Sequence, residues 1–270
     1  MMTRIYVGLL WALSAGLIWA AEPLKVLYIT GGCCHDYQRQ KEIIPAGVKQ
    51  RANVEFTVVH AGGSGTRYQG IENSLYQKPD WAKGYDVVIH NECFADDQDL
   101  EYVERVLKPH REGVPAVVVH CTMHTFRALK TNVFREFLGV ASFGHGPQHP
   151  LDVKLVKAEH PILRGFPADW KTGPEELYAI SQVFSNTTVL ATAADKKKDG
   201  SGQWVETERS HALIWVNTYG KGRVFGTTLA HNNYTFADPV FLDMFTRGLL
   251  WACDKLDEAG RPKAGYGPVK

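Results

Sequence analysis

Pro115-Ala-Val-Val-Val-His120-Cys-Thr-Met-His124 is the stretch on which the fold prediction rests. Its continuous run of small and β-branched apolar residues predicts a strand that is buried on both faces, as in a parallel sheet. The residues that follow, from His124 on, predict the start of a helix. Two histidines and a thiol therefore lie at a strand-to-helix corner. Because ligands bind at the carboxyl ends of strands in open α/β sheets, this corner is a candidate site.

The composition favours one large folded domain. The chain has 270 residues, of which 44% are hydrophobic and 22% charged, and its formal net charge is +1. Such a chain can bury a substantial core. It carries no long basic block, so we expect no nucleic-acid partner.

The N-terminus has the pattern of a secretory signal peptide over residues 1–21. Arg4 precedes an apolar run at residues 5–19, and small residues, Ala20 and Ala21, follow. This pattern predicts cleavage after one of these alanines and a secreted or periplasmic mature protein. An uncleaved membrane anchor is the alternative, but the run is short for a bilayer span. We expect no transmembrane segment in the mature chain.

Further apolar segments at residues 24–30, 54–60 and 85–90 predict strands that alternate with helices. One helix is expected over residues 38–50, and another, capped by Asp96, buries Leu100, Val103 and Leu107 and ends near Gly113. Strand–helix alternation up to about residue 138 is typical of a doubly wound parallel sheet.

The second half is rich in strands with antiparallel connections. Strands are predicted at residues 153–157, 176–180 and 188–192, and a hairpin joins 211–217 to 222–230. The run Lys196-Lys197-Lys198 suggests a solvated loop. A helix over 238–253 closes the domain, and residues 257–270 are expected to form a flexible C-terminal tail.

Polar residues follow several predicted strands and converge on one edge of the sheet, since parallel strands end on the same side. They provide candidates for acid–base or nucleophilic catalysis, namely His35, His120, His231, Glu92 and Cys121. A second hypothesis is a divalent metal ion such as zinc, bound by His120, His124 and Asp36. Taken singly, each histidine is more typical of an ordinary hydrogen-bonding loop residue than of a ligand.

Cys121 occupies the place of a nucleophile elbow, but Val119 and Met123 stand where an elbow usually has glycine. A packed cysteine is therefore the favoured interpretation. The five cysteines are odd in number, so at least one thiol is unpaired. The neighbours Cys33 and Cys34 could form a disulfide, and the sequence does not fix their redox state.

Residues near the last of these strand ends are candidates for sugar binding. Tyr234 and Phe236 could stack on a sugar ring, and Asn232 and Asn233 could bind hydroxyl groups. His145, in the loop at 139–150, is a further substrate-binding candidate.

Motifs over about residues 24–255 resemble those of the ThuA-like (trehalose utilisation) family. They are Thr30-Gly31-Gly32 with His35-Asp36, Tyr85-Asp86-Val87-Val88, Gly113 with Val117-Val118-Val119-His120, His160-Pro161-Ile162-Leu163-Arg164-Gly165-Phe166-Pro167, Glu176-Leu177-Tyr178, Val189-Leu190-Ala191-Thr192, Tyr219-Gly220-Lys221-Gly222-Arg223-Val224-Phe225, Thr228-Leu229-Ala230-His231 and Gly248-Leu249-Leu250-Trp251-Ala252. Pro115 and Cys121 depart from the family pattern.

The resemblance implies one ThuA-like domain over residues 22–256. It also implies an α/β fold of the flavodoxin-like, class I glutamine amidotransferase-like three-layer type. A central, mainly parallel sheet would carry an added antiparallel β-rich portion. The family lacks the amidotransferase catalytic triad, so the resemblance implies a sugar-related role and not glutaminase chemistry.

Three functions follow as hypotheses. The first is an exported hydrolase, lyase or isomerase of carbohydrate catabolism that acts on a 3-keto-glycoside or a disaccharide. The second is a non-catalytic sugar-binding or regulatory module, and the third is a Cys-dependent amidase-like hydrolase. The expected partner is a small-molecule carbohydrate, and the sequence leaves a homo-oligomer open.

Overall fold

The structure is a computed structural model that describes residues 21–69 and 71–269. The signal peptide predicted over residues 1–21 lies outside the described residues, apart from Ala21. Among the described helices, none is both long and apolar enough to cross a membrane.

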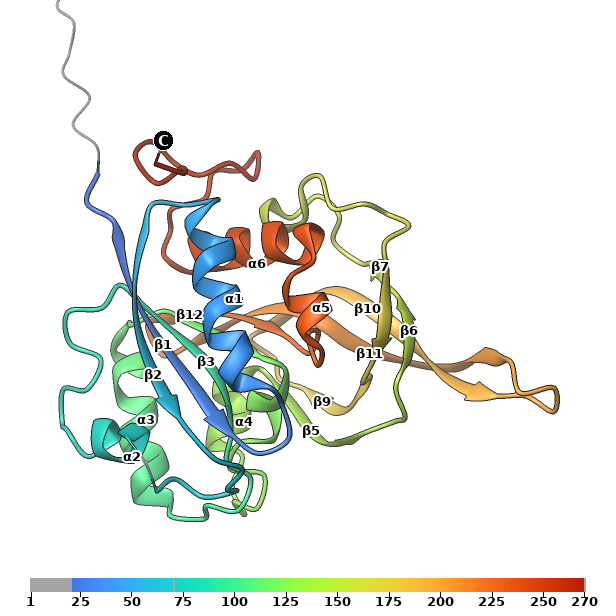
Figure 1. Ribbon diagram of the computed structural model, residues 1–270, viewed down its shortest axis with the longest axis horizontal. Coiled ribbons are helices and arrows are strands. Elements are labelled where there is room, and N and C mark those ends of the chain that lie inside the picture. The colour runs from blue at the N-terminus through green and yellow to red at the C-terminus, as the bar shows by residue number, and fades with distance from the viewer. Residues whose placement is uncertain (1–20, 70, 270) are drawn as a thin grey trace, which may run out of the picture.

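A single large sheet dominates the described part of the chain (Figure 1). Its strands, in spatial order, are β2 (Val54–Ala61), β1 (Leu24–Gly32), β3 (Val87–Cys93), β4 (Ala116–Val119), β12 (Gly222–Thr227), β11 (Trp204–Tyr219), β10 (Thr187–Lys198) and β7 (Lys154–Leu155). Neighbours from β2 to β12 are parallel, and those from β12 to β7 are antiparallel. The alternation in the first half thus gives the predicted parallel sheet.

Helices cover both faces of the sheet and produce three layers (Figure 1). One face packs on α1 (Tyr37–Lys49), α5 (Asn233–Phe236) and α6 (Pro239–Ala252), and the other on α2 (Ile71–Tyr76), α3 (Leu100–Glu112) and α4 (Val133–Leu138). Successive residues of a strand point to opposite faces. Accordingly, Val26 and Tyr28 of β1 enter the first layer, while Leu27 and Ile29 enter the second.

The antiparallel portion lies at one side of the sheet. β5 (Val140–His145) pairs with β9 (Tyr178–Val183), and β6 (His149–Asp152) pairs with β8 (Lys171–Glu175). β10 and β11 form a long hairpin that projects beyond the body (Figure 1). Lys196–Lys198 belong to this hairpin, where they pair with residues 204–206, so the prediction of a loop there was wrong.

Two local predictions are corrected at helix starts. The N-cap of α3 is Asp99, whose Oδ1 accepts hydrogen bonds from the backbone of Glu101 and Tyr102 at 3.0 and 3.2 Å. It is not Asp96, and Leu100 is exposed because it begins the helix instead of lying one turn inside it. Residues His120–His124 form a short 3₁₀-helix, η1, and α4 starts only at Val133.

Residues 257–269, expected to be a flexible tail, are hydrogen-bonded to the body. The Asn53 amide donates to the backbone of Gly265 at 3.1 Å, and the backbone N–H of Asn53 donates to Tyr266. Tyr266 also packs against the core. A second short 3₁₀-helix, η2 (Pro161–Leu163), lies against α6.

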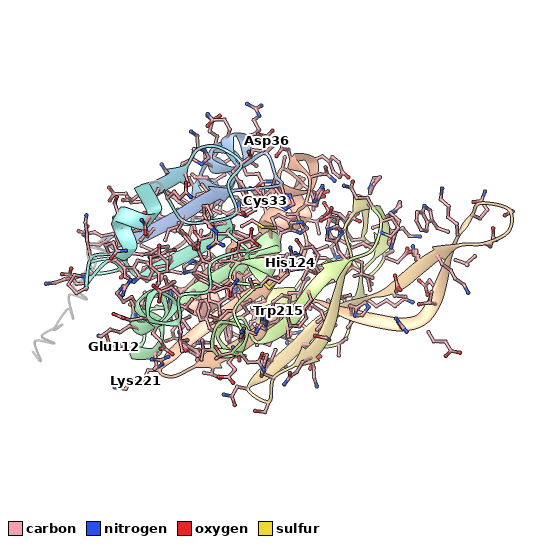
Figure 2. All side chains as sticks on the ribbon, turned by 90° about the horizontal axis from the view of Figure 1, so that it is seen from below. Cys33, Asp36, Glu112, His124, Trp215 and Lys221 are labelled. Atoms are coloured by element: carbon pink, nitrogen blue, oxygen red, sulfur yellow. A yellow bond between two sulfur atoms is a disulfide. The ribbon has the colours of Figure 1, made fainter. Side chains whose placement is uncertain are left out.

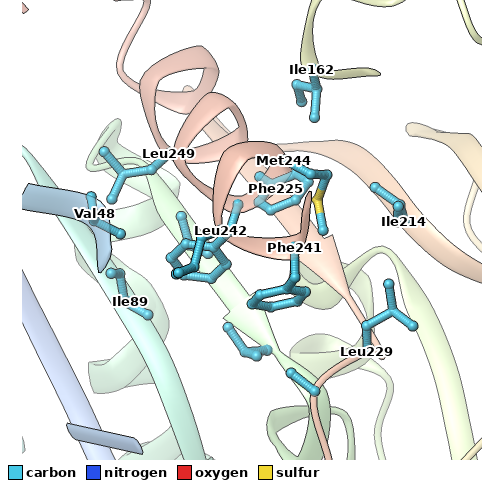
Figure 3. Packing of buried hydrophobic residues seen from close by; sticks show 14 of the residues in the cluster. Val48, Ile89, Ile162, Ile214, Phe225, Leu229, Phe241, Leu242, Met244 and Leu249 are labelled. Atoms are coloured by element: carbon cyan, nitrogen blue, oxygen red, sulfur yellow. The ribbon is translucent and has the colours of Figure 1, made fainter. Parts of the chain in front are cut away.

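The closing helix α6 is the main cover of the first face (Figure 3). Phe241, Phe245 and Leu249 of α6 are fully buried, and the Phe245 ring meets Phe225 of β12 edge-on at 6.4 Å. Gly248 lets the helix approach the sheet, because a Cβ atom there would lie 2.3 Å from the Phe225 ring. The contact between α6 and β12 therefore has no room for a side chain at residue 248.

We predict that Gly248→Ala destabilises the fold. Overpacking costs up to about 3 kcal/mol, and alanine recovers about 1 kcal/mol through helix propensity, so we expect a net loss of about 1–2 kcal/mol. Urea unfolding would measure it. Gly200→Ala is the matched control, since nothing lies within 4 Å of its added Cβ. Equal unfolding midpoints for the two variants would contradict this packing.

Candidate functional site

Three histidines meet at the carboxyl edge of the parallel strands. His35 follows β1, His120 follows β4 and His231 follows β12. One ring nitrogen of each lies within 4.8 Å of those of the other two. We call these residues the histidine trio. In Figure 2 the labelled Cys33, Asp36 and His124 mark this region, away from Glu112 and Lys221.

The backbone beside each member of the trio has an unusual conformation. Cys34, His120 and Ala230 have φ values of 86°, 44° and 77°, in the left-handed region that disfavours residues with a side chain. Such positions persist only where the surrounding structure imposes them, and they cluster at functional sites. The sharp turn after β4 is made by His120, one residue before the Cys121 of the elbow hypothesis.

His120 has one nitrogen anchored and one turned to the trio. Its Nδ1 lies 2.6 Å from the carbonyl oxygen of Thr228, so Nδ1 carries the proton and donates it. The lone pair is therefore on Nε2. This Nε2 is buried without a hydrogen-bond partner, and so are Nδ1 of His35 and Nδ1 of His231.

Glu176 completes the cluster from the antiparallel portion, just before β9. Its Oε2 lies 3.1 Å from His231 Nδ1, 3.5 Å from His120 Nε2 and 3.4 Å from His145 Nε2. These are ion-pair distances whose geometry is not that of an aligned hydrogen bond. Burial alone would raise the pKa of Glu176, but His120 and His231 hold it well below its usual range. Glu176 is therefore a carboxylate at neutral pH.

The trio contains groups of different proton affinity. Burial, followed by the neighbouring His120 and His231, lowers the pKa of His35 to about 2, so His35 is neutral and keeps a lone pair. Burial also acts to lower the pKa of His231, but the neighbouring carboxylate of Glu176 outweighs it and raises that pKa. The site thus offers an unprotonated imidazole beside a histidine–carboxylate pair.

Glu175 fixes the loop that carries His231. It is fully buried, and it accepts hydrogen bonds from the backbone N–H of His231 at 2.8 Å and from the Thr235 hydroxyl. Neither Glu175 nor Glu176 was predicted from the sequence to have a role. The available signal was the Glu176-Leu177-Tyr178 motif, but this motif lies at the start of an antiparallel strand, and only the ends of parallel strands are bound to share one edge.

The structure does not group the metal ligands as the sequence suggested. His124 stacks on Tyr178, with ring centroids 4.4 Å apart, and its Nε2 lies 3.3 Å from the Ser142 hydroxyl. Asp36 caps α1 through Arg39 and accepts a hydrogen bond from Asn233 at 2.7 Å. His120 alone of the expected ligands belongs to the trio.

Glu92 and Cys121 are also not presented as expected. β3 continues to Cys93, so Glu92 points into the second core layer, where His90, Tyr76 and Tyr68 contact it at 2.8, 2.9 and 3.2 Å. Cys121 forms a disulfide with Cys93. Glu92 is therefore held in the core, and Cys121 has no free thiol that could act as a nucleophile.

Of the sugar-binding candidates, three lie at the surface beside His231. Asn232 donates to the Pro174 carbonyl and to the Tyr234 hydroxyl at 2.9 Å each, and Tyr234 is 48% exposed. Phe236 is fully buried in the core, so the expectation that it stacks on a sugar was wrong. His145 is exposed at the rim, where it reaches Glu176.

Two adjoining cavities open at the trio. One of about 370 Å³ is lined by residues that include His35, His124, Glu176, Tyr178 and His231, and by four cysteines. The other, of about 400 Å³, lies between the turn at Cys34–Asp36 and the turn at His231–Asn233. Volumes of this order are typical of small-molecule sites.

Comparison with known proteins agrees with this fold. The ThuA family, described as trehalose utilisation, matches residues 25–252, and the chain belongs to this family. No curated protein matches the chain. The description of the family supports a carbohydrate-related role.

Solved structures of similar fold include two ThuA-like proteins. One, from Parabacteroides merdae, has a TM-score of 0.64 and 21% identity, over 92% of this chain and 98% of its own. The other, from Bacteroides uniformis, has a TM-score of 0.61 and 16% identity, over 90% and 97%. A cytoplasmic protein from Salmonella typhimurium has a TM-score of 0.55 and 13% identity, over 85% and 99%. The fold is accordingly of the class I glutamine amidotransferase-like type.

Proposed function

We propose that this ThuA family member is an exported enzyme of carbohydrate catabolism that holds a divalent metal ion on His35, His120 and His231. The observation that carries the proposal is the convergence of three ring nitrogens that make no hydrogen bond, two of which, those of His120 and His231, face the carboxylate of Glu176. Unpaired buried polar atoms are unfavourable, and a shared cation satisfies all three at once.

The donor set fits zinc or a similar ion. Neutral imidazole is the form that binds a metal, and burial keeps His35 neutral. The bond from His120 Nδ1–H to Thr228 orients its Nε2, as outer partners of metal-bound histidines do. One ring nitrogen of each histidine already lies within 4.8 Å of the other two, so small movements of the rings would let the three hold one ion.

The residues around the trio supply proton transfer. A bound divalent ion would act as a Lewis acid toward a carbonyl or hydroxyl oxygen of the substrate. Glu176, a carboxylate at neutral pH, would accept a proton and, once protonated, could donate it again. His145 and Tyr234 would contact the sugar at the rim.

A keto-glycoside suits this combination of groups. A carbonyl at C3 makes the hydrogen at C2 acidic, so a carboxylate can remove it. The bond from C1 to the leaving oxygen then breaks, and that oxygen takes a proton from an acid. Glu176 provides this base beside a site for an electrophile, and the proton that it takes from C2 can then pass to the leaving oxygen. A disaccharide or its 3-keto form is therefore the proposed substrate, with elimination or hydrolysis as the reaction.

We predict that protein stripped with a chelator binds one zinc ion per chain, measured by calorimetry and elemental analysis. His35→Gln should weaken binding by more than the roughly 10–100-fold that follows loss of an outer partner. His124→Gln is the matched control and should bind nearly normally. Loss of binding in His124→Gln with normal binding in His35→Gln would favour the ligand set His120, His124 and Asp36, and no uptake at all would contradict the metal site.

We predict turnover of 3-keto-disaccharides by the metal-loaded protein, followed as release of reducing sugar. His231→Gln and Glu176→Gln should each lower kcat by about 100-fold or more, since the first removes a metal ligand and the second removes the proton-transfer group. His160→Gln, outside the site, should retain activity. Stabilisation by the sugar without turnover would instead indicate a binding module. Activity that survives in both site variants would show that the trio is not the active site.

Export is proposed from the apolar run at residues 5–19. Expression of the full chain in a bacterium should yield a periplasmic product whose N-terminal sequence starts at Ala21 or Glu22. An intact Met1 on the recovered protein would contradict cleavage.

A further inference from the structure

Four of the five cysteines gather beside the histidine trio. Cys33 and Cys34 follow β1, Cys93 ends β3, and Cys121 follows β4 within η1. The structure joins Cys33 to Cys34 and Cys93 to Cys121 by disulfides. Cys253, at the end of α6, has no disulfide partner, in agreement with the odd cysteine count. The proposed function uses none of these sulfur atoms.

The two disulfides are in contact with each other. The sulfur of Cys33 lies 3.8 Å from the sulfur of Cys93, although 60 residues separate them in the sequence. The sulfurs of Cys33, Cys34 and Cys93 all lie within 4.8 Å of one another. Thiol–disulfide exchange proceeds when a thiolate meets a disulfide sulfur, and this arrangement provides that approach.

The two pairs differ in their access to solvent. Cys34 is exposed and Cys33 is partly buried, whereas Cys93 and Cys121 are only 2% and 4% exposed. All four line the cavity of about 370 Å³ next to the trio. A thiol from solution therefore meets the Cys33–Cys34 pair first, and the Cys93–Cys121 pair lies behind it.

We propose that the two pairs form a thiol–disulfide relay that carries two electrons from an external dithiol to the buried Cys93–Cys121 disulfide. In the first stage the external dithiol reduces Cys33–Cys34 and itself becomes a disulfide. Cys33, as thiolate, then attacks the sulfur of Cys93. A Cys33–Cys93 bond forms, the Cys93–Cys121 bond breaks, and Cys121 leaves as a thiolate that takes up a proton.

The second stage restores the exposed pair. Cys34, as thiolate, attacks the sulfur of Cys33, so the Cys33–Cys34 bond forms again and Cys93 leaves as a thiolate. The net change is oxidation of one external dithiol and reduction of one internal disulfide. These two exchange steps require neither a metal ion nor a sugar, so the relay is independent of the proposed carbohydrate chemistry.

Two cysteines of the relay are neighbours in the chain of two histidines of the trio. Cys34 directly precedes His35, and Cys121 directly follows His120. Cys34 and His120 are also two of the residues with left-handed φ values. Reduction of each pair therefore releases a covalent link next to one histidine of the trio.

The sharpest test is Cys34→Ser in the full mature chain, analysed by acid quench, alkylation and non-reducing peptide mapping. Without Cys34, the Cys33 thiol has only the Cys93–Cys121 disulfide within reach. We expect a Cys33–Cys93 disulfide together with an alkylated Cys121. A fully alkylated Cys33 with Cys93–Cys121 intact, in protein with native circular dichroism, would overturn the relay.

A second variant keeps the proposal testable if Cys34→Ser fails to fold. In Cys33→Ser the attacking sulfur is absent. Because exchange rates follow access, dithiothreitol should then reduce Cys93–Cys121 about tenfold or more slowly than in the unmodified chain. Cys253→Ser is the matched control and should leave both the pairing and the rate unchanged. Equal rates in Cys33→Ser and the unmodified chain would show that no electrons pass through Cys33.

Discussion

The left-handed turn at His120 is the constraint on which the site depends. β4 lies between β3 and β12 and is buried on both faces, so its chain must leave the sheet sharply where the strand ends. The carbonyl of Thr228 then holds the imidazole of His120 so that Nε2 points to His35 and His231. With φ near 44°, this conformation is unfavourable for a residue with a side chain, and the packed sheet around it maintains it.

The parallel sheet and the three histidines of the site were predictable from the sequence. Parallel strands end on the same edge, so histidines that follow β1, β4 and β12 must meet, even though they lie far apart in the chain. The parallel pairing of β12 with β4 places His231 on that edge. The apolar run at 116–119 predicts a central parallel strand, and this prediction places His120 at the shared edge without any knowledge of side-chain contacts.

The errors in the site prediction have two physical origins. In a strand, side chains alternate between faces, so a small error in where the strand ends changes what a residue contacts. β3 runs to Cys93, which turns Glu92 into the core, and the elbow falls on His120 instead of Cys121. Glu175 and Glu176 come from the antiparallel portion, whose packing on the parallel edge depends on tertiary contacts that no local pattern encodes.

The proposed metal site joins His35, His120 and His231 around one ion. Anomalous diffraction from a crystal of the zinc-loaded protein, recorded on both sides of the zinc absorption edge, tests this most directly. We expect one strong peak at about 2.0–2.1 Å from His35 Nδ1, His120 Nε2 and His231 Nδ1. A peak at His124 and Asp36 in its place, or a zinc-loaded crystal without a peak at the trio, would rule out this metal site.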